Sequence, residues 1–550
     1  ERKRQAPKGR RVEPSALADV QRLLGSESRQ ADLLIEHLHR IQDHFGHLSA
    51  AHLAALAQEM RLAQTEVYEV ATFYHHFDVV KEGEAAPAPL TVRVCDGLSC
   101  EMAGARDLLD RLPALLGREV RVIAAPCIGR CEQAPAAVVG QNPVPNATAE
   151  AVVATVAAGD VQHAPKGFVD FSSYRATGGY ALLGQCICGD RDVESVLKTM
   201  EDSGLRGLGG AGFPAGRKWR IVRAEAGPRL MAVNIDEGEP GTFKDRVYLE
   251  RDPHRFLEGM LIAAWAVGIE KIYIYLRDEY HGCRAMLETE LDKLRLAPPM
   301  AGMPQIELRR GAGAYICGEE SAMIESIEGK RGMPRLRPPY VAQVGLFGRP
   351  TLEHNFETLF WVREILEKGG AWFTSHGRNG RKGLRSFSVS GRVKNPGVKL
   401  APAGITIQEL IDEHCGGMQD GHTFYAYLPG GASGGILPAS MNSIPLDFDT
   451  LQPYGCFIGS AAVIVLSDQD TATNAARNMM RFFHHESCGQ CTPCRVGTAK
   501  AAHLMEQPKW DLPLLADLSL VMRDASICGL GQAAPNPMDC VVKYFPHELT

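Results

Sequence analysis

The segments MAVNI (231–235), FLEGMLIAAWAVG (256–268) and KIYIY (271–275) decide the class of fold. The first and third are short apolar runs typical of buried strands. The second is an apolar run of helical length, interrupted only by Glu258, and indicates a buried helix. Because such helices and strands alternate from residue 190 to about residue 385, we expect a large α/β domain in this part of the chain.

Regions of different character flank this α/β segment. Residues 15–80 carry apolar residues at helical spacing, and strand-like runs at 90–94 and 120–124 enclose a helix at 103–116. From residue 386 short β-like runs alternate with Gly/Pro turns, and helical periodicity then returns. We therefore predict a multidomain α/β chain whose regions are 12–160, 165–385, 386–470 and 471–550.

Composition places the chain among ordinary globular proteins. It has 550 residues, 45% of them apolar and 23% charged, with a formal net charge of −6. This acidic balance argues against nucleic acid as a partner, because phosphate binding needs clustered positive charge. No apolar run is long enough to span a bilayer. The first residues lack the apolar core of a secretory signal, and we expect a cytoplasmic protein.

Three cysteines at every third position form the strongest motif. The segment ESCGQCTPCR (486–495) supplies Cys488, Cys491 and Cys494, and Cys528 follows in SICGLG (526–531). A close triple with a distant fourth thiolate is typical of a 4Fe–4S cluster. Structural zinc is usually held by two pairs of ligands. The spacing therefore favours an iron–sulfur cluster over zinc.

Two further cysteine pairs follow the strands of the N-terminal α/β unit. Cys95 and Cys100 come after the first strand, and Cys127 and Cys131 after the second. We expect both pairs on strand-end loops, where four thiolates suit a 2Fe–2S cluster. Zinc is the alternative, because the first spacing lies within the range of zinc-finger ligands.

The loop GLRGLGGAGFP (204–214) contains Gly207, Gly209 and Gly212 at the spacing G-x-G-x-x-G. A dinucleotide-binding fingerprint must follow a strand, whereas the run before this loop, 193–200, is helical. The glycines nevertheless leave backbone N–H groups free to approach a phosphate. We therefore expect a phosphate-binding loop that is not a Rossmann turn, with a plain turn as the alternative.

Short polar residues follow the strand at 231–235. Asn234 and Asp236 open the segment NIDEGEPGTFKDR (234–246), where side chains at a strand end are well placed to bond ribityl or ribose hydroxyls. A second glycine-rich segment, GAGAYICGEE (311–320), ends in two acidic residues. A solvated run of charges is the alternative for the first segment.

Together these segments resemble a known family. Residues 170–550 resemble the flavin subunit of respiratory complex I, through GLRGLGGAGFPAGRKW, NIDEGEPGTFKDR, GAGAYICGEESAMIES, ESCGQCTPCR and SICGLGQAAPNP. Residues 15–160 resemble its thioredoxin-like 2Fe–2S partner, through VATFYHHF and the four N-terminal cysteines. A fusion of the two is similar to the beta subunit of NAD-dependent molybdenum- or tungsten-containing formate dehydrogenases, and to the flavin subunit of NAD-reducing hydrogenases.

The resemblance implies a fold, a set of cofactors and a set of site residues. The expected fold is N-terminal helices with a thioredoxin-like 2Fe–2S domain, an α/β domain for FMN and NAD, a small β-grasp-like module and a C-terminal helical bundle with a 4Fe–4S cluster. The residues carried over for FMN are Gly207, Gly209, Gly212, Asn234, Asp236, Tyr315, Gly318, Glu319, Asn355 and Thr358. Those carried over for NAD(H) are Phe213, Lys218, Glu239 and Glu320. The cluster ligands are Cys95, Cys100, Cys127, Cys131, Cys488, Cys491, Cys494 and Cys528.

The implied reaction is reversible hydride transfer between NAD and FMN, followed by exchange of single electrons with the 4Fe–4S cluster. Nothing in the sequence resembles a formate or hydrogen site, so we expect the distal donor to bind on a partner. The resemblance implies a molybdenum-containing alpha subunit and a small 2Fe–2S gamma subunit as partners. A nickel-containing hydrogenase partner is one alternative, and a structural scaffold that binds zinc is another.

Overall fold

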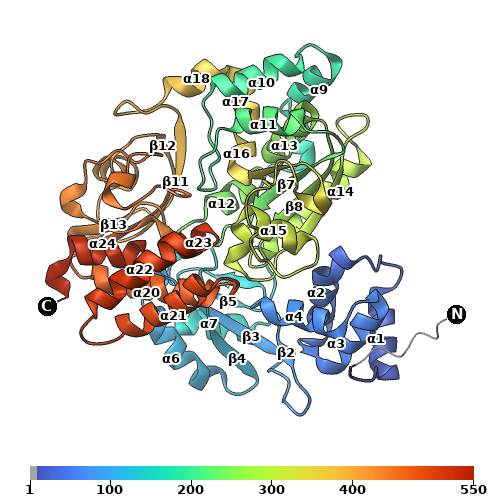
Figure 1. Ribbon diagram of the computed structural model, residues 1–550, viewed down its shortest axis with the longest axis horizontal. Coiled ribbons are helices and arrows are strands. Elements are labelled where there is room, and N and C mark those ends of the chain that lie inside the picture. The colour runs from blue at the N-terminus through green and yellow to red at the C-terminus, as the bar shows by residue number, and fades with distance from the viewer. Residues whose placement is uncertain (1–8, 550) are drawn as a thin grey trace.

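The computed structural model describes residues 9–549, which fold around four β-sheets (Figure 1). The N-terminal and C-terminal helices lie at different ends of the molecule, with the sheets between and above them. None of the helices in this part of the chain combines the length and the apolar character that crossing a membrane would require.

The chain begins with four helices, α1 (Pro14–Leu24), α2 (Leu34–Phe45), α3 (Ala50–Met60) and α4 (Gln64–Phe73). The apolar residues of α2 recur at helical spacing, and Leu34, Leu38 and Ile41 are buried. Two short parallel strands, β1 (Leu48–Ser49) and β2 (Val79–Val80), join the ends of this helical segment.

The second region is a four-stranded sheet in the order β4-β3-β5-β6. Its strands are β3 (Leu90–Cys95), β4 (Val120–Ala125), β5 (Ala137–Val139) and β6 (Asn142–Val144). β3 pairs in parallel with β4 and antiparallel with β5, and helices α6 (Ala105–Leu116) and α7 (Ala149–Ala157) pack beside it.

The helix predicted at 103–116 differs from the observed structure. It is split into α5 (Leu98–Met102) and α6, because Gly104 adopts a left-handed conformation with φ of 94° between them. Cys100 therefore lies on a short helix, and the prediction that it sits on a strand-end loop was wrong.

The third region is a parallel sheet in the order β10-β7-β8-β9. Its strands are β7 (Arg229–Ile235), β8 (Ile269–Leu276), β9 (Gln305–Arg310) and β10 (Thr351–Asn355). The βαβ unit predicted from the sequence is β7, α13 (Pro253–Val267) and β8, with α12 (Lys244–Arg251) preceding α13.

Side chains of the central strands alternate between two hydrophobic cores. Met231 and Val233 of β7 join the core that contains α13, whereas Leu230 and Ala232 join the core shared with the N-terminal helices. β8 shows the same alternation. Both faces of this sheet are therefore covered, as expected of a parallel sheet.

The last two regions are a mixed sheet and a group of helices. The sheet has the order β12-β11-β15-β13-β14, with β11 (Leu384–Gly391), β12 (Gly397–Pro402), β13 (Phe424–Leu428), β14 (Leu437–Pro438) and β15 (Ala462–Ser467). The helices are α20 (Ala472–Glu486), α21 (Thr492–Met505), α22 (Leu512–Ala525), α23 (Gly529–Ala533) and α24 (Asn536–Tyr544).

Gly259 on α13 tests how closely this helix packs against α16 (Phe356–Phe360). A Cβ atom at Gly259 would lie 2.1 Å from the carbonyl oxygen of Leu359. We expect Gly259→Ala to lower the free energy of unfolding by roughly 1–3 kcal/mol, because a backbone segment must move to admit the methyl group. Thermal unfolding followed by circular dichroism measures the effect.

Gly184 provides the matched control, since it lies inside another helix, α9 (Ala181–Cys188), and no heavy atom of the described chain would come within 4 Å of an added Cβ. Gly184→Ala should be neutral or stabilising by up to about 1 kcal/mol, because alanine is the better helix former. Equal transition temperatures for the two variants would contradict the packing described for α13.

Candidate functional site

The candidate site lies where the parallel sheet reverses its order. β8 and β9 follow β7 on one side, and β10 lies on the other side. In open α/β sheets ligands bind at the carboxyl ends of the strands beside such a reversal. Asn234 of β7 lies directly opposite Asn355 of β10, so the predicted polar residues of the two strands meet at this point.

The glycine-rich loop is folded onto these strand ends. It forms a tight turn in which the Gly207 N–H donates to the carbonyl of Phe213 at 2.8 Å. The Leu208 N–H donates to the hydroxyl of Thr358 at 2.9 Å. A Cβ at Gly209 would lie 3.0 Å from the Cβ of Asn355, so the loop approaches the strand end too closely for a larger residue.

A buried acid faces this loop region. Asp236 Oδ2 is buried and has no hydrogen-bond partner among the residues that the structure describes. Burial raises the pKa of this carboxyl well above its usual range. Asn234 accepts the Asp236 N–H at 3.0 Å and donates to the carbonyl of Gly318 at 2.9 Å. An unsatisfied buried oxygen beside a glycine cradle fits a polyhydroxylated group such as the ribityl chain of FMN.

A second wall is built around Glu239. This residue is buried, and its carboxylate accepts hydrogen bonds from the Tyr315 hydroxyl and from the N–H of Ser433, the latter at 2.8 Å. Burial raises the pKa of Glu239. Ser433 comes from the turn that follows β13, so this wall joins the α/β domain to the mixed sheet.

The mouth of the site carries opposed charges. Glu319 caps α15 (Glu320–Ile327), and Arg337 forms ion pairs with Glu319 and, at 3.0 Å, with Glu320. Lys218 lies 3.2 Å from a carboxylate oxygen of Glu353. These residues bring predicted NAD(H) contacts beside predicted FMN contacts.

Phe213 lies at the same mouth and is 38% exposed. The Arg217 guanidinium lies 5.7 Å from the centre of its ring. An aromatic face that remains open to solvent is suited to stacking on an adenine or nicotinamide ring.

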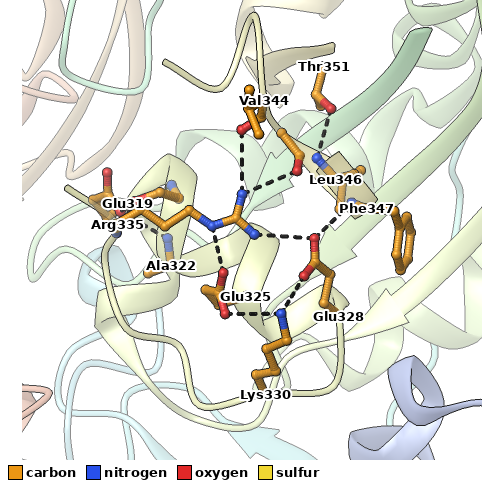
Figure 2. Close-up of polar contacts among 12 residues, drawn as sticks. Glu319, Ala322, Glu325, Glu328, Lys330, Arg335, Val344, Leu346, Phe347 and Thr351 are labelled. Carbon is orange, nitrogen blue, oxygen red and sulfur yellow. Dashed lines mark hydrogen bonds and ion pairs between the residues drawn. The ribbon is translucent and has the colours of Figure 1, made fainter. Parts of the chain in front are cut away.

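Arg335 holds the loop that carries Arg337. Figure 2 shows its guanidinium between the carboxylates of Glu325 and Glu328, at 2.5 and 3.2 Å, and the backbone carbonyls of Val344 and Gly345. Lys330 joins the same two carboxylates. This network fixes the loop from residue 330 to residue 351 above β10.

The four N-terminal cysteines converge in a buried place. The sulfur atoms of Cys127 and Cys131 are 3.3 Å apart, and Cys95 is hydrogen-bonded to both Cys100 and Cys127. All four residues are buried free thiols. Their convergence without a disulfide fits a 2Fe–2S cluster held by thiolates.

The C-terminal cysteines also converge. Three of them lie between the end of α20 and the first turn of α21, and Cys528 immediately precedes α23. All four line one cavity together with Ile316 and Leu530. The four sulfur ligands and the apolar lining fit a 4Fe–4S cluster.

Sequence reasoning missed three residues of this site. Ser433 lies in PGGASGG (429–435), which was noted only as a turn, although its glycine content matches the other two loops. Asp245, within the acidic segment, accepts a hydrogen bond from Asn355 at 2.6 Å. No signal in the sequence identified Arg337.

Comparison with family models assigns each region. Residues 200–364 match the Nuo51 FMN-binding domain, and residues 20–159 match the thioredoxin-like [2Fe-2S] ferredoxin. Residues 474–550 match the NADH-ubiquinone oxidoreductase-F iron-sulfur binding region, and residues 386–437 match the SLBB domain. The predicted fold class and the predicted cofactors are thereby confirmed, and iron–sulfur is favoured over zinc at both cysteine sites. The individual FMN and NAD(H) contacts remain predictions.

Two curated proteins are similar over the flavin and C-terminal regions. One is an NADH-quinone oxidoreductase subunit of Rhizobium meliloti, the second of the F type, which is 40% identical over 392 residues; these are 69% of this chain and 93% of that protein. NADH dehydrogenase [ubiquinone] flavoprotein 1 of Dictyostelium discoideum is 40% identical over 66% of this chain and 79% of that protein.

A solved structure is similar over nearly the whole chain. A chain of the NAD+-reducing [NiFe]-hydrogenase in the H2-reduced state superposes with a TM-score of 0.83 and 34% identity, covering 95% of this chain and 92% of that chain. This protein therefore belongs to the family of NADH-quinone oxidoreductase F-type flavoprotein subunits, with a thioredoxin-like 2Fe–2S domain ahead of the flavin domain.

Proposed function

We propose that this chain is the NAD(H)-oxidising or NAD-reducing subunit of a multisubunit enzyme, and that the enzyme oxidises formate on a partner subunit. When bound, FMN supplies the exchange between a hydride from NADH and single electrons. The protein's part is to hold both nucleotides, exclude water and set the flavin beside a cluster.

One structural link carries this proposal. The Tyr315 hydroxyl contacts Glu239 in the candidate flavin site, and the next residue, Ile316, lines the cavity of the C-terminal cysteines. The Tyr315 N–H donates to the carboxylate of Glu486, two residues before Cys488, at 3.0 Å. One short segment therefore contributes to both sites, an arrangement suited to electron transfer between flavin and cluster.

Each group of residues has a role in this function. The N–H groups of the glycine-rich loop are suited to the FMN phosphate, and Asn234 and Asp236 to its ribityl hydroxyls. Glu239 and Ser433 close the side that faces the mixed sheet. Phe213, Lys218 and Glu320 stand at the mouth, where NAD(H) would enter.

Two features of the sequence support formate as the distal donor. The thioredoxin-like domain precedes the flavin domain in one chain, and the segment LRPPYVAQVGLFGRPTLEHNFETL (336–359) resembles the formate dehydrogenase beta subunits. The same features imply a molybdenum-containing alpha subunit, a small 2Fe–2S gamma subunit and a cytoplasmic location.

A hydrogenase diaphorase is the second candidate, and one specific observation favours it. The similarity to the NAD+-reducing [NiFe]-hydrogenase chain extends over 95% of this chain, including the N-terminal region. In that case the partner would carry nickel in place of molybdenum or tungsten.

Purification of the tagged chain with its native partners tests the assignment. Molybdenum or tungsten in the complex, together with NAD reduction driven by formate, is the expected result. Nickel with hydrogen-driven NAD reduction would replace formate by hydrogen. A complex that contains none of these metals would contradict both.

Thr358 tests the position of the glycine-rich loop. Thr358→Val removes the acceptor of the buried Leu208 N–H, and an unsatisfied buried N–H costs about 1–3 kcal/mol. We expect the dissociation constant of FMN to rise roughly 5- to 100-fold, measured by fluorescence titration of the deflavinated protein. Thr358→Ser should restore binding. Thr199→Val removes a hydroxyl that bonds only within α10 (Val193–Asp202) and should leave FMN affinity unchanged.

Arg335 tests the loop above the mouth. Arg335→Met breaks the network that holds Arg337 beside Glu319 and Glu320. We expect the KM for NADH to rise roughly 3- to 10-fold with a smaller change in kcat, because ground-state binding is lost.

Arg331→Met is the control for that measurement, since Arg331 is 41% exposed and pairs only with Glu69 across the surface. Flavin and iron contents should match the unaltered protein in both variants. An unchanged KM in Arg335→Met would remove the loop from the NAD(H) site.

A further inference from the structure

A buried cluster of imidazoles lies between the N-terminal helices and the α/β domain, away from the cysteine sites. His39 belongs to α2, which packs against β9 of the parallel sheet (Figure 1). His76 follows α4, and Asp278 follows β8. We propose that these three residues bind a divalent transition metal of the zinc class, which fastens the N-terminal helices to the α/β domain.

The hydrogen bonds of His39 fix which nitrogen is free. His39 is 2% exposed, and its Nε2 lies 2.9 Å from the carbonyl oxygen of Gly311. A carbonyl only accepts, so Nε2 carries the hydrogen and Nδ1 carries the lone pair. Nδ1 is buried and has no hydrogen-bond partner within residues 9–549.

His76 is arranged in the same way. Its Nδ1 lies 2.8 Å from Asp278 Oδ2, and its buried Nε2 finds no partner in the described part of the chain. The centres of the His39 and His76 rings are 4.8 Å apart. Two imidazoles with unused nitrogens therefore stand side by side in a buried place, next to a carboxylate.

Protonation does not satisfy these nitrogens. Burial, with the nearby charges of Arg310 and His76, lowers the pKa of His39 well below its usual range, so the ring is neutral near pH 7. A lone pair that meets neither a donor nor a proton is costly in the interior. Neutral imidazole is also the form that binds metals.

The ligand set suits zinc. One ligand atom from each of His39, His76 and Asp278 lies within 4.8 Å of the other two. Ligands around tetrahedral zinc are roughly 3.3 Å apart at bond lengths of about 2.0–2.1 Å, so small rotations of the side chains close the site. Two imidazoles and one carboxylate leave a fourth position for water.

Outer contacts already orient these ligands. The carbonyl of Gly311 holds the His39 ring, and Arg310 donates to the other oxygen of Asp278 at 2.6 Å. Metal-bound histidines and carboxylates usually have such outer partners. Asp43 pairs with the same Arg310 at 2.6 Å and balances part of its charge.

The consequence is a crosslink between distant parts of the chain. The ligands come from α2, from the segment after α4 and from the end of β8, which belong to two regions of the fold. A metal at this point would stabilise the junction because it binds only the folded arrangement.

Metal analysis of the complete protein tests the proposal. The protein is expressed with iron and zinc supplied, brought to full iron content and measured by inductively coupled plasma mass spectrometry. We expect about one zinc per chain beyond the iron, and an X-ray absorption spectrum of zinc that contains nitrogen and oxygen neighbours only. Sulfur neighbours at about 2.3 Å would place the zinc at the cysteines and overturn the proposal.

Variants identify the ligands. His39→Gln and His76→Asn should each lose that zinc while retaining flavin and iron. His37→Gln is the matched control, because His37 lies on the same helix, is equally buried and also has a free Nδ1, yet belongs to no cluster of potential ligands among the described residues.

His37→Gln should keep its zinc. Equal zinc in His39→Gln and the unaltered protein would overturn the proposal. So would the absence of zinc from unaltered protein dialysed against a zinc buffer, since a water molecule would then satisfy the imidazoles.

Discussion

The parallel pairing of β7 with β10 is the constraint on which the rest of the site depends. It sets Asn234 opposite Asn355 and creates the reversal of strand order at which a crevice opens. The glycine-rich loop reaches this edge only because Gly209 lacks a side chain that would meet Asn355. Since Thr358 follows the same strand and holds the loop at Leu208, one pair of strands positions both sides of the flavin site.

Electron transfer needs two sites in contact, and the fold provides this through residues 315 and 316. The buried carboxylate of Glu486 accepts from the Tyr315 backbone at 3.0 Å, which ties α20 to the α/β domain. Tyr315 points its hydroxyl at Glu239, and Ile316 faces the cysteine cavity. A displacement of the C-terminal helices would therefore disturb the flavin site as well, so the two sites are mechanically coupled.

The sequence predicted those features that are local. The βαβ unit around α13 follows from periodicity, and the cysteine spacing identified the C-terminal ligands before their cavity was known. The split at Gly104 was missed because one glycine interrupts an otherwise helical pattern only through its conformation. Ser433 and Arg337 were missed for another reason: they reach the site from distant segments, and no spacing in the sequence records that approach. The pairing of β10 beside β7 belongs to the same class.

The acidic segment after β7 illustrates why such features escape sequence reasoning. A solvated run of charges was one reading of Lys244 and Asp245, yet both are buried. Burial alone would lower the pKa of Lys244, but Asp245 and Glu357 outweigh it and the pKa is raised. Buried charges of this kind add little net stability, because desolvation offsets their attraction. Asp245 also accepts the side-chain amide of Asn355, so the network fixes the orientation of a residue at the strand end. Its charges are better explained as a means of holding the flavin site in one geometry than as a source of folding energy.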